Sequence, residues 1–238
     1  ASRISSSGVS FTNAASYWAN VPATINGVLG GYGHISDIDV KASQAFLSKI
    51  FSMKNPPGNK LALDCGAGIG RVSKYVLIPR FDKVDLVEQD DKFINTAKQF
   101  ICEGTSCTSK LGTMYRIGLQ NFQFDTKKKY DVIWCQWVLG HLDDFSLVAF
   151  LKNCTQALAN NGVIVIKENI TTSETIDYDD EDSSVTRPLH LMEKIFQSAR
   201  LKVLFMDIQD DFPDDIYAVY SFALLPSALV EKPRIEII

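Results

Sequence analysis

The chain has 238 residues, of which 46% are hydrophobic and 22% are charged, which is enough apolar material for one sizeable core. Its net charge is −4, and its one basic run is Lys127–Lys129, so a nucleic-acid partner is disfavoured because duplexes are bound by basic faces. No apolar run reaches the roughly 20 residues that span a bilayer. We therefore expect a single domain over residues 1–238 that neither crosses a membrane nor binds nucleic acid.

The five cysteines, at positions 65, 102, 107, 135 and 154, have no CxxC spacing, and no histidine cluster accompanies them. This pattern predicts reduced thiols in an intracellular protein and no metal site. Residues 1–10 lack the apolar stretch of a signal peptide, and we expect them to be a ragged polar end.

The first half of the chain predicts helices followed by an alternation of strands and helices. Helices are expected over 14–20 and 39–53, with a loop at the glycine-rich stretch 27–34 between them. Strands are expected over 61–65 and 84–88, and helices near 70–78 and over 91–101.

The second half continues the alternation, with strands expected over 130–134 and 163–167 and helices over 144–159 and 189–199. Two further strands, 201–207 and 217–224, are close enough to pair antiparallel. Continuous apolar strands separated by helices are typical of a parallel sheet covered on both faces. The sequence therefore predicts an α/β fold with a doubly wound, mostly parallel sheet.

A glycine-rich loop, Asp64-Cys-Gly-Ala-Gly-Ile-Gly-Arg71, follows the first of these strands. In a doubly wound sheet such a loop lies at the ligand crevice, although a tight turn that binds nothing is the alternative. The spacing is GxGxG, not the GxGxxG of a dinucleotide site, and Glu88 ends the next strand, where a carboxylate can bind a ribose diol. A ribose without a pyrophosphate favours an adenosyl cofactor, and Arg71 is a candidate partner for the carboxylate of a methionyl tail.

These residues resemble the class I S-adenosylmethionine-dependent methyltransferases. A narrower resemblance, to the protein N-terminal methyltransferases, rests on five motifs in order. They are Leu29-Gly-Gly-Tyr-Gly-His-Ile35, Ala62 to Arg71, Val132-Ile-Trp-Cys-Gln-Trp-Val138, Gly140-His-Leu142 and Asp182-Ser-Ser-Val185. The family methylates the α-amine of chains that begin Xaa-Pro-Lys or Xaa-Pro-Arg after removal of the initiator methionine. The likeness runs from about Tyr17 to Leu224.

The resemblance implies a seven-stranded sheet, an N-terminal helical extension at about 12–55, a core at about 56–224, a hairpin or loop inserted after the fifth strand, and a tail at 225–238. It implies S-adenosylmethionine as cofactor, converted to S-adenosylhomocysteine, and exposed protein N-termini as substrates. The family acts in the nucleus and cytoplasm, and we expect this chain in one or both. Nothing in the sequence sets its oligomeric state or the number of methyl groups added.

The resemblance also assigns site residues. The implied cofactor-binding residues are Gly66, Gly68, Arg71, Glu88, Gln89, Asp90, Leu119, Gln120 and Gln136. The implied substrate-binding residues are Trp18, Leu29, Ile35, Trp137, Asn169, Asp179, Ser184 and Tyr217. His141 and Asp182 match the family's proton acceptors. One departure is that Glu88-Gln-Asp90 replaces a more usual Asp-led triplet.

The residues themselves give independent support for the substrate that the resemblance implies. The acidic segment from Glu174 to Asp182 follows the fifth strand and suits a substrate that carries an ammonium and a basic side chain, although a solvated acidic loop is the alternative. Asn169 is positioned to accept from an ammonium, and the flat ring of Trp137 suits a proline. For His141, the alternative is a structural role as a hydrogen-bonded histidine of the core.

Three other functions compete with N-terminal methylation. A methyltransferase for a small-molecule amine or a base is weakened because Cys135-Gln-Trp-Val138 stands where base methyltransferases often have an Asn/Asp-Pro-Pro-Tyr motif. A non-catalytic binding module is weakened because the glycines and Glu88 are present. A nicotinamide oxidoreductase is disfavoured by the GxGxG spacing.

Overall fold

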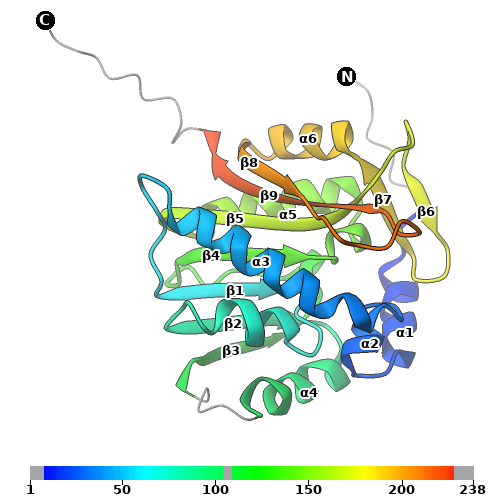
Figure 1. The fold of residues 1–238 in the computed structure, drawn as a ribbon, viewed down its shortest axis with the longest axis horizontal. Helices are drawn as coiled ribbons and strands as arrows, with labels where there is room; N and C mark the ends of the chain where they lie inside the picture. The colour runs from blue at the N-terminus through cyan, green and yellow to red at the C-terminus, as the bar shows by residue number, and fades with distance from the viewer. Residues whose placement is uncertain (1–7, 104–108, 228–238) are drawn as a thin grey trace, which may run out of the picture.

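The computed structural model describes residues 8–103 and 109–227. Its centre is a nine-stranded sheet in which β3, β2, β1, β4 and β5 are parallel neighbours (Figure 1). Strand β9 runs antiparallel between β5 and β8. The strands are β1 Leu61–Cys65, β2 Lys83–Glu88, β3 Leu111–Arg116, β4 Tyr130–Gln136, β5 Leu158–Thr171, β6 Asp177–Asp179, β7 Ser184–Pro188, β8 Leu201–Ile208 and β9 Ala218–Pro226. The predicted doubly wound, mostly parallel sheet is confirmed.

The remaining two strands, β6 and β7, form the inserted hairpin that was expected after the fifth strand. Strand β7 also pairs with the end of β5, through Ile170 and Thr171. The pattern analysis did not identify β3, although seven strands were expected from the resemblance. Strand β3 is only partly buried and its residues do not alternate between apolar and polar, so it carries a weak strand signal.

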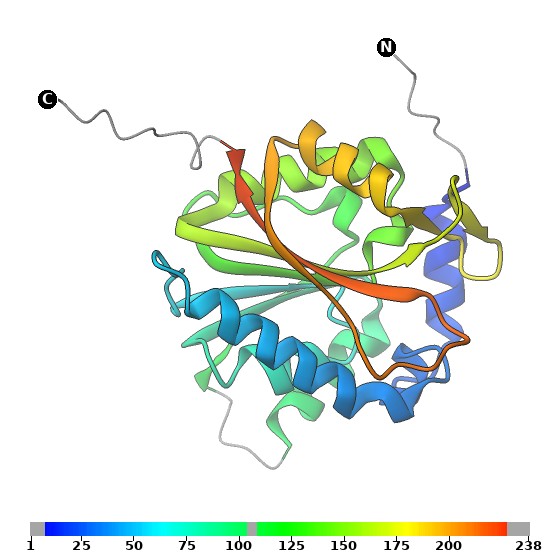
Figure 2. The same cartoon turned by 45° about the horizontal axis from the view of Figure 1, so that its top comes forward.

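The helices flank the sheet on both faces (Figure 2). They are α1 Phe11–Asn20, α2 Ile25–Val28, α3 Ser36–Phe51, α4 Asp91–Cys102, α5 Asp144–Ala157 and α6 Leu189–Ser198. Successive side chains of a strand point to opposite faces, so β4 contributes Ile133 and Cys135 to one apolar cluster and Val132 and Trp134 to the other. The first cluster contains α5 and α6, and the second contains α3 and α4.

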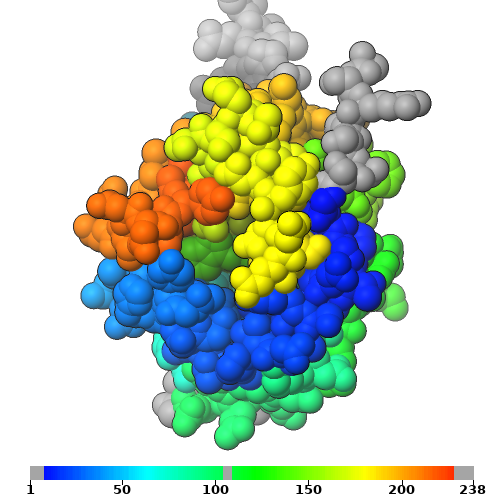
Figure 3. All heavy atoms as spheres, turned by 90° about the vertical axis from the view of Figure 1, so that its right-hand side faces the viewer, coloured from blue at the N-terminus to red at the C-terminus, as the bar shows by residue number. Residues whose placement is uncertain are grey.

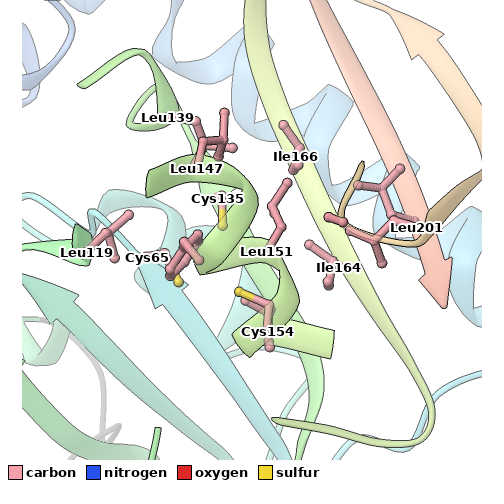
Figure 4. Packing of buried hydrophobic residues seen from close by; sticks show 14 of the residues in the cluster. Cys65, Leu119, Cys135, Leu139, Leu147, Leu151, Cys154, Ile164, Ile166 and Leu201 are labelled. Atoms are coloured by element: carbon pink, nitrogen blue, oxygen red, sulfur yellow. The ribbon is translucent and has the colours of Figure 1, made fainter. Parts of the chain in front are cut away.

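Figure 4 shows the first cluster, in which Leu151 and Cys154 of α5 lie against Ile164 of β5. The thiols of Cys65, Cys135 and Cys154 are fully buried there, among aliphatic side chains. Burial raises the pKa of the Cys65 and Cys154 thiols, because a thiolate is poorly solvated in an apolar core. These three cysteines act as small core residues. Cys107 lies outside the described residues.

Two of the predicted elements differ from the structure. The stretch 27–34 is not entirely a loop: α2 ends inside it, and a 3-10 turn, Gly33–Ile35, begins in it. The Thr24 hydroxyl accepts from the N–H of Gly27 at 3.0 Å and so caps α2, a helix too short to show a periodic pattern. The helix expected near 70–78 is mostly a π-helix, Ser73–Leu77, with an N–H···O bond from Ile78 to Ser73.

The expected boundaries also shift by a few residues. The helical extension predicted at about 12–55 corresponds to α1 to α3, which span Phe11 to Phe51, and β9 continues to Pro226, two residues into the predicted tail. The rest of the tail, 228–238, and residues 1–7 of the expected polar end lie outside the described residues. No helix in the described part of the chain is long and apolar enough to cross a membrane.

The attachment of α3 to the sheet can be tested at Leu47, which is 0% exposed in the second cluster. We expect Leu47→Ala to lower the free energy of unfolding by about 2–5 kcal/mol, because it leaves a cavity in a close-packed interface. Urea denaturation measures the loss. Lys41→Ala, at an exposed position of the same helix, is the control and should change stability by less than about 0.5 kcal/mol. Equal effects of the two variants would contradict this account of the packing.

Candidate active site

The loop after β1 requires its glycines. Gly66, Gly68 and Gly70 have φ of 68°, 55° and 80°, which is the left-handed region that favours glycine. A Cβ atom at Gly66 would lie 2.3 Å from the Val138 side chain, and one at Gly70 would lie 2.5 Å from that of Ile101. The loop therefore needs glycine at these positions, because only then can it approach both the turn that carries Val138 and helix α4.

Glu88 ends β2 and holds this loop in place. Its Oε2 accepts from the N–H of Gly68 at 2.8 Å, and its Oε1 accepts from the N–H of Asp90 at 2.9 Å. Burial raises the pKa of the carboxyl, and the backbone N–H donors oppose that shift by favouring the charged form. Each oxygen retains acceptor capacity, so the side chain fits the predicted contact with a ribose diol.

A cavity opens between this loop, the end of β2, the turn after β4 and helix α1. The cofactor-binding residues predicted from the sequence line it with one exception: they are Gly66, Gly68, Arg71, Glu88, Gln89, Leu119, Gln120 and Gln136. The exception is Asp90, which does not line the cavity. Its carboxylate caps α4 by accepting from the N–H of Phe93 at 3.0 Å, because a helix start leaves amide donors unsatisfied.

Arg71 is buried on the cavity wall rather than solvated at a helix start. Its Nη1 lies 2.7 Å from Oδ2 of Asp39, a carboxylate of α3 that sequence reasoning missed. The other Asp39 oxygen lies 2.6 Å from Nζ of Lys167, and Gln136 Nε2 donates to both oxygens at 2.9 Å. The cavity thus has a fixed buried cation beside the glycine loop. Together with Glu88 it fits an adenosyl cofactor that carries a carboxylate.

A second cavity, which we call the groove, adjoins the first. Figure 3 shows the hollow framed by the N-terminal helices, the β6–β7 hairpin and the segment before β9. Its volume of about 760 Å³ is within the range of ligand pockets. Every substrate-binding residue predicted from the sequence lines it: Trp18, Leu29, Ile35, Trp137, Asn169, Asp179, Ser184 and Tyr217. So do both predicted proton acceptors, His141 and Asp182.

The groove is acidic, but its acids differ in part from those expected. Asp179 and Asp182 come from the predicted acidic segment, whereas Asp214 and Asp215 come from the segment before β9 and were missed. Asp177 instead accepts hydrogen bonds from the hydroxyls of Thr171 and Tyr217. The sequence analysis found only Asp179 and Asp182, because they directly follow the fifth strand. Asp214 and Asp215 lie in the connection between the antiparallel strands β8 and β9, far from that strand in the sequence.

The turn after β4 carries Trp137 in a left-handed conformation, with φ of 51°. A non-glycine residue there stores strain, which persists only where the surroundings hold it. Oε1 of Glu168 accepts from the N–H groups of Val138 and Leu139, both at 2.8 Å, and the indole N–H donates to Oδ1 of Asn169 at 3.0 Å. The oxygen of Asn169 that we expected to accept from a substrate ammonium therefore also positions the Trp137 ring.

His141 lies on the same turn, and its Nε2 is 3.9 Å from Oδ2 of Asp182. The indole N–H of Trp18 donates to this Nε2 at 3.0 Å, so His141 is a hydrogen-bonded, part-buried side chain. Burial lowers the pKa of His141, against the opposing effect of Asp182, which favours the charged form. Burial and the Trp18 donor both favour the neutral imidazole.

The two cavities meet at residues that line both: Trp18, Val28, Leu29, Trp137 and His141. A group held in the first cavity and a chain end held in the second would be in contact at this boundary. The arrangement is suited to a transfer reaction between two bound molecules.

The sequence model of a family described as AdoMet dependent proline di-methyltransferase matches residues 7–225. The chain belongs to this family. The protein N-terminal Xaa-Pro-Lys N-methyltransferase 1 of Xenopus tropicalis is 48% identical over 216 residues, which are 90% of this chain and 94% of the relative. The alpha N-terminal protein methyltransferase 1 of Drosophila melanogaster is 44% identical, over 91% of this chain and 76% of the relative.

Solved structures agree with this membership. A SAM-dependent methyltransferase of Leishmania major superimposes with a TM-score of 0.82 at 34% identity, over 90% of this chain and 82% of that one. The magnesium protoporphyrin IX methyltransferase of Synechocystis with bound SAM has a TM-score of 0.62 at 15% identity, over 88% and 90% of the two chains, and shows the shared fold. The predicted family, fold and cofactor are confirmed, and the chain is an S-adenosylmethionine-dependent protein N-terminal methyltransferase. The small-molecule and non-catalytic alternatives are not favoured.

The role of Glu88 can be tested with Glu88→Gln. An amide has one acceptor oxygen, so it cannot keep both backbone bonds and also bind a diol. We expect affinity for S-adenosylhomocysteine, measured by calorimetry, to fall about ten- to a hundred-fold. Asp91→Asn is the control. It removes the same charge three residues further along the chain, outside the cavity, and should bind S-adenosylhomocysteine with unchanged affinity. Unchanged affinity of Glu88→Gln would contradict the assignment.

Proposed function

We propose that this enzyme methylates the free α-amine of proteins that begin Xaa-Pro-Lys or Xaa-Pro-Arg. The observation that carries the proposal is the acidic groove that meets the cofactor cavity at His141 and Trp137. The name of the Xenopus relative supports an Xaa-Pro-Lys N-terminus, and the name of the Drosophila relative supports methylation of a protein α-amine.

The walls of the groove match the three features of such an N-terminus. The indole of Trp137, fixed by Asn169, offers a flat apolar face to the proline ring. The carboxylates of Asp179, Asp214 and Asp215 favour a Lys or Arg side chain at the third position. The first residue then lies at the boundary with the cofactor cavity, where its amine is to be methylated.

The amine must lose a proton before it can attack, and its chemistry makes this step easy. An α-amine has a pKa of about 7.8, so its deprotonation at pH 7 costs about 1 kcal/mol. A lysine side chain, with a pKa of about 10.4, would cost about 4.6 kcal/mol. An enzyme with one carboxylate and one imidazole as proton acceptors is therefore suited to an N-terminus and poorly suited to a lysine.

Asp182 and His141 are the proposed acceptors. Oδ1 of Asp182 is buried and has no hydrogen-bond partner among the described residues, so its acceptor capacity is unused. His141 faces the same carboxylate, and neutral imidazole can accept a proton. Bound S-adenosylmethionine supplies a methyl group on a positively charged sulfonium. The residues at the boundary orient the amine towards that group and exclude water.

The substrate can be tested with three hexapeptides that differ at one feature each. With S-adenosylmethionine present, we expect mass spectrometry to show methylation of a peptide beginning Ser-Pro-Lys. Its N-acetylated form has no basic α-amine, although it keeps the lysine side chain, and should not react. A peptide beginning Ser-Pro-Glu should react slowly because it meets the groove acids with like charge. Equal methylation of the acetylated peptide would overturn the proposal.

The role of Asp182 can be tested with Asp182→Asn, which replaces the carboxylate with an uncharged amide. We expect kcat to fall about a hundred-fold or more, in the range of a lost general base. Cofactor affinity should survive, because Asp182 does not line the cofactor cavity. Asp180→Asn changes an exposed acid of the same loop and is the matched control. Parallel losses of turnover and cofactor binding would show that Asp182 is structural.

A further inference from the structure

Trp18 contacts the candidate base directly, although it is 123 positions away in the sequence. Its indole Nε1–H donates to Nε2 of His141 at 3.0 Å, and the two rings meet edge to face, with centroids 5.8 Å apart at 88°. Trp18 belongs to α1, in the N-terminal extension, and lines both cavities. The extension therefore contributes a donor to the boundary where the reaction takes place.

This hydrogen bond fixes the state of His141. An indole N–H can only donate, and an imidazole nitrogen can only accept when it carries no proton. The bond therefore favours the neutral tautomer with hydrogen on Nδ1, a buried nitrogen that has no hydrogen-bond partner among the described residues. It also occupies the single lone pair of Nε2, which is the nitrogen that faces Asp182.

The charged groups around His141 act against this state. Asp182 and Asp179 of the hairpin favour the protonated ring, as does the Ser183 backbone. Arg187 of β7 binds the carbonyls of Leu139 and Leu142 in the same turn and is paired with Asp144. The groups that oppose the acids are the apolar surroundings and the Trp18 donor.

We propose that Trp18 is a positioning residue that masks the Nε2 lone pair of His141 in the peptide-free enzyme and yields it to the ammonium of an arriving N-terminus. The inference rests on the proposed function. The ammonium and the indole compete for one lone pair, and a charged donor forms the stronger hydrogen bond, roughly twice that of a neutral one. Transfer then breaks an N–H bond of the ammonium and forms Nε2–H, and the electron pair stays on the amine nitrogen. Asp182, 3.9 Å from Nε2, stabilises the imidazolium.

The test is Trp18→Phe, which keeps an aromatic ring beside His141 and Phe93 and removes the N–H. The first measurement is ¹⁵N NMR of the imidazole nitrogens without peptide. The chain has three histidines, so His141→Gln assigns the signals. We expect a fixed tautomer protonated at Nδ1 in the unmodified enzyme. In Trp18→Phe we expect a tautomer mixture and a pKa of His141 higher by about one unit, because the neutral ring loses a hydrogen bond.

The second measurement is the pH profile of kcat/KM with the Ser-Pro-Lys peptide. The acid limb in Trp18→Phe should move to higher pH by the same amount as the NMR pKa. Tyr17→Phe, which changes the adjacent residue of α1, should leave both the NMR signals and the limb unchanged. Urea denaturation checks that the variants are folded.

The outcomes separate the inference from the proposed function. An unchanged tautomer and pKa in Trp18→Phe would overturn the masking, whatever the substrate is, because no peptide is present. A uniform loss of activity at every pH would show that Trp18 only packs against the groove. If no peptide is methylated but the NMR changes are seen, the masking stands and the proposed substrate fails.

Discussion

The site depends on the buried carboxylate of Asp39, which lies between two buried cations. Oδ2 is 2.7 Å from Arg71 and Oδ1 is 2.6 Å from Lys167. Burial alone would raise the pKa of Asp39, but the two cations hold it below its ordinary value, so the group stays charged. A buried charge is tolerated only when it is paired and hydrogen-bonded. The pairing therefore requires α3, the glycine loop and β5 to take one relative arrangement, and Gln136 adds β4 to the same set.

The same cluster connects the two cavities. Arg71 lines the first cavity. On the other side of Asp39, Nζ of Lys167 donates to Oε1 of Gln209 at 2.8 Å. Gln209 begins the segment that carries Asp214 and Asp215, two acids of the groove. The position of the groove wall thus depends on the position of the glycine loop after β1. Catalysis by approximation requires such a link, because a small misplacement of either molecule slows transfer.

The turn after β4 is held from two sides. Glu168 of β5 binds its amide N–H groups, and Arg187 of β7 donates to the carbonyls of Leu139 and Leu142, at 3.2 and 2.6 Å. Burial raises the pKa of Glu168 to about 7, because little solvent reaches this carboxyl. These contacts stabilise the left-handed backbone at Trp137. The strained turn presents an indole to the groove and His141 to the boundary.

The sequence by itself determined most of the parallel sheet, the glycine loop and Glu88, because each depends on local spacing and periodicity. The motif resemblance predicted the site residues, and all of them except Asp90 line one of the two cavities, whereas the Asp90 carboxylate caps α4. Tertiary structure alone decided β3, the pairing of Asp39 with Arg71 and Lys167, and the contact of Trp18 with His141. The physical reason is that a weakly patterned strand and a buried ion pair are specified by neighbours far away in the chain. Spacing along the sequence cannot show that the distant Trp18 donor reaches His141.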